Sequence, residues 1–119
     1  MPLERRRPGH LRFPVRVPAL MIEEDKPWGR PTPGETRNIS RGGARLRVEE
    51  ATIPSNAVAV TLRLVYRPPL TLTGTVVWRA GRPEPPGWDL AIQFNEEIDQ
   101  QLVAEIADEG FRARAGPSE

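Results

Sequence analysis

The chain has 119 residues, a formal net charge of +1, 38% hydrophobic residues and 28% charged residues. This length and composition are typical of one soluble globular domain, and no apolar run approaches the roughly 18 residues that a membrane span needs. The chain has no cysteine and His10 is its single histidine, which excludes disulfides, thiolate metal sites, cysteine nucleophiles and metal motifs built on two histidines.

The first segment is basic and has no periodic apolar pattern, so we expect residues 1–11 to form a flexible N-terminal arm. It lacks the apolar stretch of a secretory signal, and a cytoplasmic location is therefore expected. Residues 4–16 hold a cluster of arginines: Arg5, Arg6, Arg7, Arg12 and Arg16. Guanidinium groups bind phosphate bidentately. A cluster this small suits a small anionic ligand better than duplex DNA, whose binders spread basic charge over a whole face.

Short segments with strand character come next, separated by turns rich in Pro and Gly. We expect strands in residues 12–22, on both sides of a turn at 40–43, and in residues 57–66, 70–79 and 88–94. Pro14 and Pro18 fit a central strand poorly, so the first strand should lie at an edge or start late. In the segment 70–79 the alternation puts Trp78 on the same face as Val76. We therefore expect Trp78 to pack in the core or at its rim and not to stack on a base.

After Phe94 the apolar residues recur with helical spacing, at Ile98, Leu102, Val103 and Ile106. The expected helix is capped near its start by Asn95 or Glu96, stops at Gly110 and leaves residues 111–119 as a frayed tail. About six short strands and one terminal helix favour a mainly β fold. We expect a small six-stranded antiparallel β-barrel with a C-terminal α-helix over residues 12–110.

The turn Asn38-Ile39-Ser40-Arg41-Gly42-Gly43 is the most informative segment for function. On its own it fits an ordinary turn, because Asn and Ser bond nearby backbone groups and Gly adopts positive φ without strain. In a barrel, however, this turn and the arginine cluster can meet at one rim. Guanidinium groups there would recognise phosphate or the O6/N7 edge of guanine. Asn38 and Ser40 would add donors and acceptors, and Gly43 would let a ligand approach the backbone.

This turn resembles the [D/N]xSxxG ligand motif of PilZ domains, which Asn38, Ser40 and Gly43 match at every defined position. The segment Gly74-Thr75-Val76-Val77-Trp78 looks like the GxVVW strand of that family, and Leu90-Ala91-Ile92-Gln93-Phe94 looks like its last strand. The resemblance covers roughly residues 5–106. The arm departs from the family's RxxxR motif, because Arg7 and Arg12 are separated by four residues instead of three; a literal RxxxR runs from Arg12 to Arg16, inside the expected strand.

The resemblance implies a PilZ-type β-barrel that binds the bacterial second messenger cyclic di-GMP and is not an enzyme. The ligand-binding residues it implies are Arg7, Arg12, Asn38, Ser40 and Gly43, with help from Arg6. The arm would be mobile without ligand and would wrap the dinucleotide on binding. An effector protein of the motility, attachment or exopolysaccharide (biofilm) machinery would then read the new surface.

Two other functions stay open. A PilZ-like domain that does not bind cyclic di-GMP and acts by protein–protein interaction is favoured by the long spacing of Arg7 and Arg12 and disfavoured by the intact turn. A small RNA- or DNA-binding barrel predicts aromatic residues interleaved with Lys and Arg on a strand face. None of the expected strands shows that pattern, so no nucleic-acid partner is expected.

Overall fold

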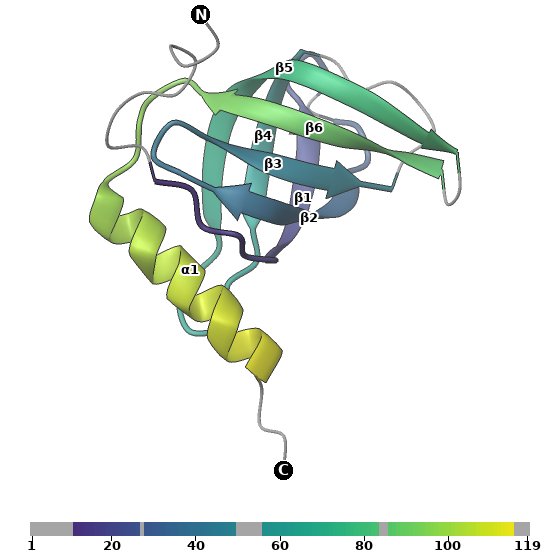
Figure 1. The fold of residues 1–119 in the computed structure, drawn as a ribbon. Coiled ribbons are helices and arrows are strands. Elements are labelled where there is room, and N and C mark those ends of the chain that lie inside the picture. The colour runs from purple at the N-terminus through teal and green to yellow at the C-terminus, as the bar shows by residue number, and fades with distance from the viewer. Residues whose placement is uncertain (1–10, 27, 50–55, 84–85, 116–119) are drawn as a thin grey trace, which may run out of the picture.

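The computed structural model describes residues 11–26, 28–49, 56–83 and 86–115, with residues 113–115 described by their backbone alone. In chain order its elements are β1 Pro18–Glu23, β2 Thr32–Ile39, β3 Gly43–Val48, β4 Ala57–Leu62, β5 Leu70–Pro83, β6 Pro86–Phe94 and α1 Gln100–Ala115. The strands form a closed barrel in the order β1-β2-β3-β6-β5-β4, and every neighbouring pair is antiparallel. The helix lies across one end of the barrel (Figure 1). The expected mainly β fold, a six-stranded antiparallel barrel with a C-terminal helix, is confirmed.

Alternation of apolar and polar residues explains the inner and outer faces of the barrel wall. In β3, Leu46 and Val48 are buried while Arg45 is exposed on the opposite face. The same period of two buries Val58 and Val60 in β4. Since the interior is filled by these side chains, a ligand has to bind on the outer wall or at a rim.

The residues ahead of β1 form an extended entry segment, residues 11–17, instead of the first half of a strand. Phe13 and Ile39 exchange two backbone hydrogen bonds, of 2.9 and 3.0 Å. The buried Thr36 hydroxyl donates to the Val15 carbonyl at 2.5 Å and accepts from the Val17 N–H at 2.8 Å. The first strand therefore starts late, at Pro18, as its prolines predicted. The backbone of β2 nevertheless forms hydrogen bonds with the entry segment, at Thr36 and Ile39.

The helix begins and ends later than the sequence predicted. Asp99 caps it, since the Asp99 carboxylate accepts the Gln101 N–H at 2.9 Å; Asn95 and Glu96 do not. Gly110 does not stop the helix, which continues to Ala115. A Cβ atom at Gly110 would lie 2.0 Å from a methyl group of Val15. Glycine at this position therefore lets the helix lie against the entry segment and does not mark its end.

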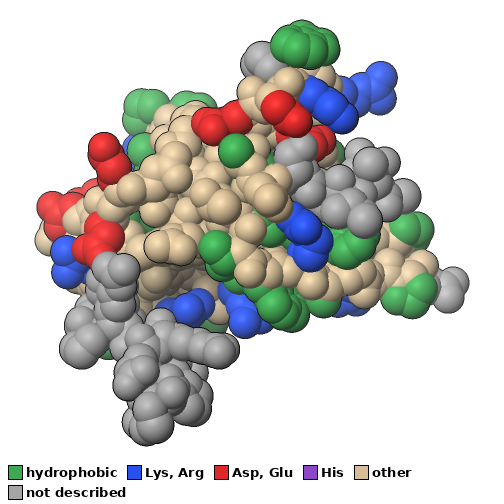
Figure 2. Space-filling view, turned by 90° about the horizontal axis from the view of Figure 1, so that it is seen from above, with side chains coloured by type: hydrophobic (Ala, Val, Ile, Leu, Met, Phe, Trp, Pro, Cys, Tyr) green, Lys and Arg blue, Asp and Glu red, His purple; other side chains and the backbone are tan. Residues whose placement is uncertain are grey.

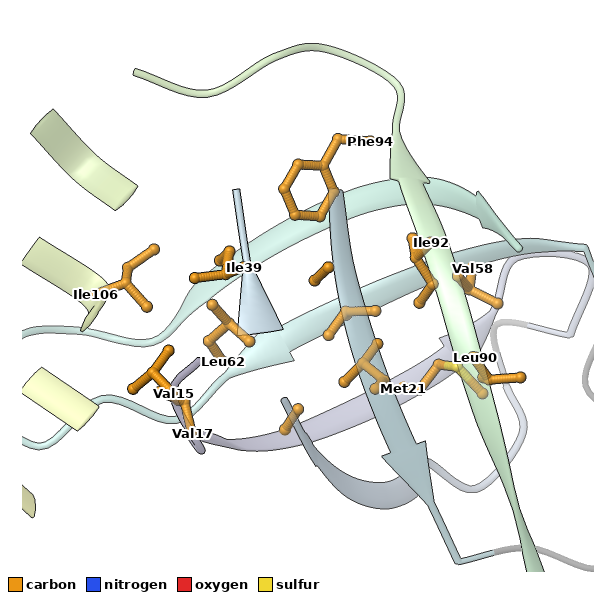
Figure 3. Packing of buried hydrophobic residues seen from close by; sticks show 14 of the residues in the cluster. Val15, Val17, Met21, Ile39, Val58, Leu62, Leu90, Ile92, Phe94 and Ile106 are labelled. Atoms are coloured by element: carbon orange, nitrogen blue, oxygen red, sulfur yellow. The ribbon is translucent and has the colours of Figure 1, made fainter. Parts of the chain in front are cut away.

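Buried side chains join the helix to the barrel. Figure 3 shows Ile106 of α1 pointing toward Val15, Ile39 and Leu62 at the end of the barrel that the helix covers. Each of these side chains is at most 2% exposed. Full burial of one such aliphatic side chain contributes about 1.5–3 kcal/mol, so this contact fixes the helix firmly. No helix in the described part of the chain is long and apolar enough to cross a membrane.

Candidate functional site

The turn between β2 and β3 is closed by Ser40. The Ser40 N–H donates to the Gly43 carbonyl at 2.8 Å, and the Ser40 hydroxyl donates to the same oxygen at 3.3 Å. Ser40 is only 5% exposed. The first task of this serine is therefore to hold the turn, and its expected contact with a ligand stays a prediction.

Gly43 is required by the packing of two strands. A Cβ atom there would lie 2.2 Å from the carbonyl oxygen of Ile92 in β6. Any side chain would push β3 away from β6 at the start of their pairing, where Gly43 lies opposite Gln93. The position thus has a structural reason to be glycine, and the close approach of a ligand there stays a prediction.

The entry segment brings one predicted arginine to the turn. Phe13 pairs antiparallel with Ile39, so the neighbouring Arg12 lies opposite Ser40 at the turn. The long side chain of Arg12 reaches diagonally to Asn38, and its Nη1 is 3.4 Å from the Asn38 Oδ1. Arg12 is exposed, and Asn38 is half-buried. Two of the predicted site residues therefore meet in the structure. Arg6 and Arg7 lie outside the described residues.

Two β-bulges turn side chains onto the outer wall of the barrel. The β2–β3 register shifts between Thr36 and Asn38, so the inward Thr36 precedes Arg37 and Asn38, neither of which is buried. The β5–β6 register shifts between Val76 and Trp78 in the same way. One extra residue in a strand reverses the facing of the residues after it, and in this way bulges aim side chains at functional surfaces.

The prediction that Trp78 packs in the core or at its rim is wrong. Val76 is buried, Val77 is 57% exposed and Trp78 is 44% exposed, because the bulge interrupts the alternation of β5. The guanidinium carbon of Arg45 lies 4.7 Å from the centroid of the Trp78 ring. This is a cation–π contact on the outer wall. Trp78 is thus an exposed aromatic surface with an arginine over it.

Four side chains form a row across four strands, which we call the outer row: Asn38 of β2, Arg45 of β3, Ala91 of β6 and Trp78 of β5. Each is the cross-strand partner of the next. Arg12 extends the outer row beyond Asn38. Together with Arg12 the outer row presents an amide, two guanidinium groups and an indole, and these groups suit base edges, phosphate oxygens and base faces respectively.

Sequence reasoning missed Arg45 and Trp78 as site residues. Arg45 lies two residues after Gly43 on a strand with clear alternation, so its outward direction was readable. The signal for Trp78 was weaker: the pair Val76-Val77 gives two apolar residues in succession, which is compatible with a bulge but does not require one.

Two arginines at the outer row are not paired with a carboxylate in the described part of the chain and can therefore bind an anionic ligand. Glu35 binds Arg37 at 2.8 Å and lies 3.9 Å from Arg16. Within the described part of the chain, Arg12 and Arg45 have no carboxylate partner. Figure 2, seen from above, shows Lys and Arg side chains beside hydrophobic ones along the lower margin, while Asp and Glu gather at the left and the top. The described residues also place no group of three His, Cys, Asp or Glu side chains where they would hold a metal ion.

The sequence model of the PilZ domain family matches residues 4–109, nearly the whole chain. Together with the closed barrel, the terminal helix and the turn after β2, this match shows that the chain belongs to the PilZ domain family. No curated protein sequence matches the chain.

Several solved structures are similar to the chain, among them the following two. The first is the PilZ domain with c-di-GMP of YcgR from Escherichia coli, at a TM-score of 0.67 and 11% identity, over 92% of this chain and 95% of that chain. The second is the inhibitor of motility of Bacillus subtilis (MotI/DgrA), at a TM-score of 0.63 and 15% identity, over 96% of this chain and 54% of that chain. The chain thus spans about half of the Bacillus protein. At these identities the similarity establishes the fold.

Proposed function

We propose that the chain binds cyclic di-GMP on the outer row and acts as a signalling adaptor, not as an enzyme. The observation that carries the proposal is the contact of Arg12 with Asn38 beside the turn that Ser40 closes. Membership of the PilZ family supports it, as does the similar YcgR domain, whose structure is described as being with c-di-GMP.

Arg12 and Asn38 are poised to exchange partners. Their 3.4 Å contact is long for a hydrogen bond, so it is weak and readily given up. A phosphodiester would offer Arg12 two oxygens in the fork geometry that guanidinium prefers. The released Asn38 amide would then donate to, or accept from, a guanine edge. Arg7 and Arg6, which precede Arg12 on the arm, would add cations to the same phosphates.

Arg45 and Trp78 extend this site along the outer row. A guanine base has a flat face that stacks on an indole, and its O6/N7 edge accepts two hydrogen bonds from one arginine. Ser40 and Gly43 would serve the site by keeping the turn tight, so that Asn38 is already in place when the ligand arrives. Preformed geometry of this kind reduces the free-energy cost of ordering on binding.

The output of binding would be a change in the arm. Arg12 lies in the entry segment that leads directly from the arm, so a ligand held by Arg12 would order the residues before it. An effector protein of the motility, attachment or exopolysaccharide machinery would read this change in the bacterial cytoplasm. The name of MotI, an inhibitor of motility, agrees with the first of these pathways.

Isothermal titration with cyclic di-GMP tests the proposal. We expect binding at micromolar concentration or below, and Arg12→Ala and Asn38→Ala should each weaken it about tenfold or more, the equivalent of a charged hydrogen bond of about 1.5–3 kcal/mol. Arg63→Ala is the matched control, because this exposed arginine comes directly after β4 on the β1–β4 side of the barrel, away from the outer row. No heat from the wild type at high micromolar ligand would contradict the proposal and favour the alternative, a domain that acts by protein–protein interaction.

A further inference from the structure

Arg41 sits at a variable position of the NxSxxG turn, yet its side chain is committed to another part of the molecule. Its Nε donates to the Ile98 carbonyl at 3.4 Å, and its Nη2 lies 3.3 Å from the Glu97 carboxylate. In return, the Ile98 N–H donates to the Arg41 carbonyl at 2.9 Å. Main chain and side chain of Arg41 therefore both bind the link between β6 and α1.

The rest of the turn is held on the same side. The Phe94 N–H at the end of β6 donates to the Gly42 carbonyl at 2.8 Å. The turn is thus attached to β6 and to the link through Arg41 and Gly42, while Asn38, four residues before Gly42, faces Arg12. In this attachment the side-chain contacts come from Arg41, and the other contacts of the turn are backbone hydrogen bonds. A substitution of Arg41 therefore removes the side-chain contacts and leaves the backbone groups in place.

We propose that Arg41 is a positioning residue for the dinucleotide site: it anchors the turn to the β6–α1 link and keeps Asn38 and Ser40 in the geometry that binds ligand. The inference rests on the proposed function and deepens it. The planar fork of arginine reaches a carbonyl and a carboxylate at once, which the single ammonium of lysine does not reproduce. The anchor also connects the ligand turn to the residues that lead into α1.

The competing role for Arg41 is direct contact with a ligand phosphate. The two roles predict opposite effects of Glu97→Gln on the affinity for cyclic di-GMP. If Arg41 acts through the link, Glu97→Gln weakens cyclic di-GMP binding, although it removes a negative charge near an anionic ligand. If Arg41 grips phosphate, Glu97→Gln frees it and strengthens binding. Glu96→Gln is the matched control, because it removes the same charge one residue earlier from an exposed side chain.

The experiment is isothermal titration of the full chain with cyclic di-GMP for the wild type, Arg41→Met, Glu97→Gln, the control Glu96→Gln and the Arg41→Met/Glu97→Gln double variant. We expect a three- to tenfold loss of affinity for Arg41→Met relative to the wild type and for Glu97→Gln relative to Glu96→Gln. The double variant should be no weaker than the weaker single one, since both changes break the same anchor. Tighter binding by Glu97→Gln, or wild-type affinity in Arg41→Met, would overturn the inference while leaving the proposed function intact.

Amide hydrogen exchange supplies the second readout. In ligand-free Arg41→Met, exchange should rise at the turn and at Ile98, whose N–H is bonded to the Arg41 carbonyl, and stay unchanged in β1 and β4. Unchanged exchange at Ile98 would show that the side chain does not anchor the turn. A wild type that binds no dinucleotide, with exchange at Ile98 raised in the variant, would instead refute the proposed function and with it the positioning role.

Discussion

At the scale of single residues, the exposure of Trp78 depends on one additional residue in β5. Strict alternation would place this indole inside the barrel with Val76, and the bulge places it outside beside Arg45. Bulges depend on the partner strand, so a pattern of period two in one segment does not reveal them. Asn38 reaches the outer wall by the same device in β2, and here the turn motif identified the residue without any knowledge of the bulge.

Trp78→Ala should weaken binding of cyclic di-GMP by about 1–3 kcal/mol, or roughly five- to 150-fold, because base stacking on an aromatic side chain is of this size. Unfolding in urea should change little, since the indole is 44% exposed. Val77→Ala is the control, because Val77 occupies the same bulge and also faces outward. Equal titration curves for Trp78→Ala and the wild type would exclude Trp78 from the site.

At the scale of elements, α1 is held to the barrel along two sides. On one side Gly110 lies against Val15 of the entry segment. On the other, the Glu109 carboxylate, on a residue only 3% exposed, accepts the N–H groups of Val65 and Tyr66 between β4 and β5 and an N–H of Arg67. The sequence indicated a helix from its apolar spacing. It did not indicate these two attachments, which join residues far apart in the chain.

Gly110→Ala should destabilise the protein, although alanine is usually better than glycine inside a helix by about 0.5–1 kcal/mol. The new Cβ would lie 2.0 Å from a Val15 methyl, and overpacking of this kind typically costs about 1–3 kcal/mol. Urea unfolding measures the change. Gly110→Ala in a Val15→Ala background should cost less than in the wild type. A more stable single variant would show that the helix does not lie on the entry segment.

Stability should fall in acid partly through Glu105. The hydrogen bond from Arg67, and then one from Gln101, hold the pKa of the Glu105 carboxyl below its ordinary value of 4.5. A carboxyl whose pKa is lower in the folded state stabilises the fold above its unfolded pKa, and this contribution is lost as the pH falls through the folded pKa. Wild type should therefore exceed Glu105→Gln in unfolding free energy near neutral pH, and the difference should close below about pH 4.5.

The control for this pH dependence is Asp108→Asn, which breaks an exposed pair with Arg112 on the same helix. Exposed pairs of this kind contribute little to stability, so its acid profile should track that of the wild type. A gap between wild type and Glu105→Gln that is independent of pH would contradict the assignment.

At the scale of the whole molecule, the closed barrel explains why the candidate site lies on the outside. Core side chains fill the interior and α1 covers one end of the barrel. The side chains that can bind a ligand therefore lie on the outer wall of β2, β3, β6 and β5. The number of strands and their order along the chain could be predicted from the periodicity of the sequence. The closure of the barrel and the register of its strand pairs could not, because they depend on which strands pair. The meeting of Arg12 with Asn38 results from the pairing of Phe13 with Ile39, and no local pattern predicts it.

The most direct test of the outer row as the dinucleotide site is a titration of the isotopically labelled protein with cyclic di-GMP, monitored by NMR. We expect shift changes along the outer row, at the amides of Asn38 and Arg45 and at the indole N–H of Trp78, with weaker changes at the turn. The amides of Arg63 and Val65, in the link between β4 and β5 that Glu109 of α1 holds, should not move. Shifts confined to those two residues, or no shifts at all, would contradict the claim that the outer row binds the dinucleotide.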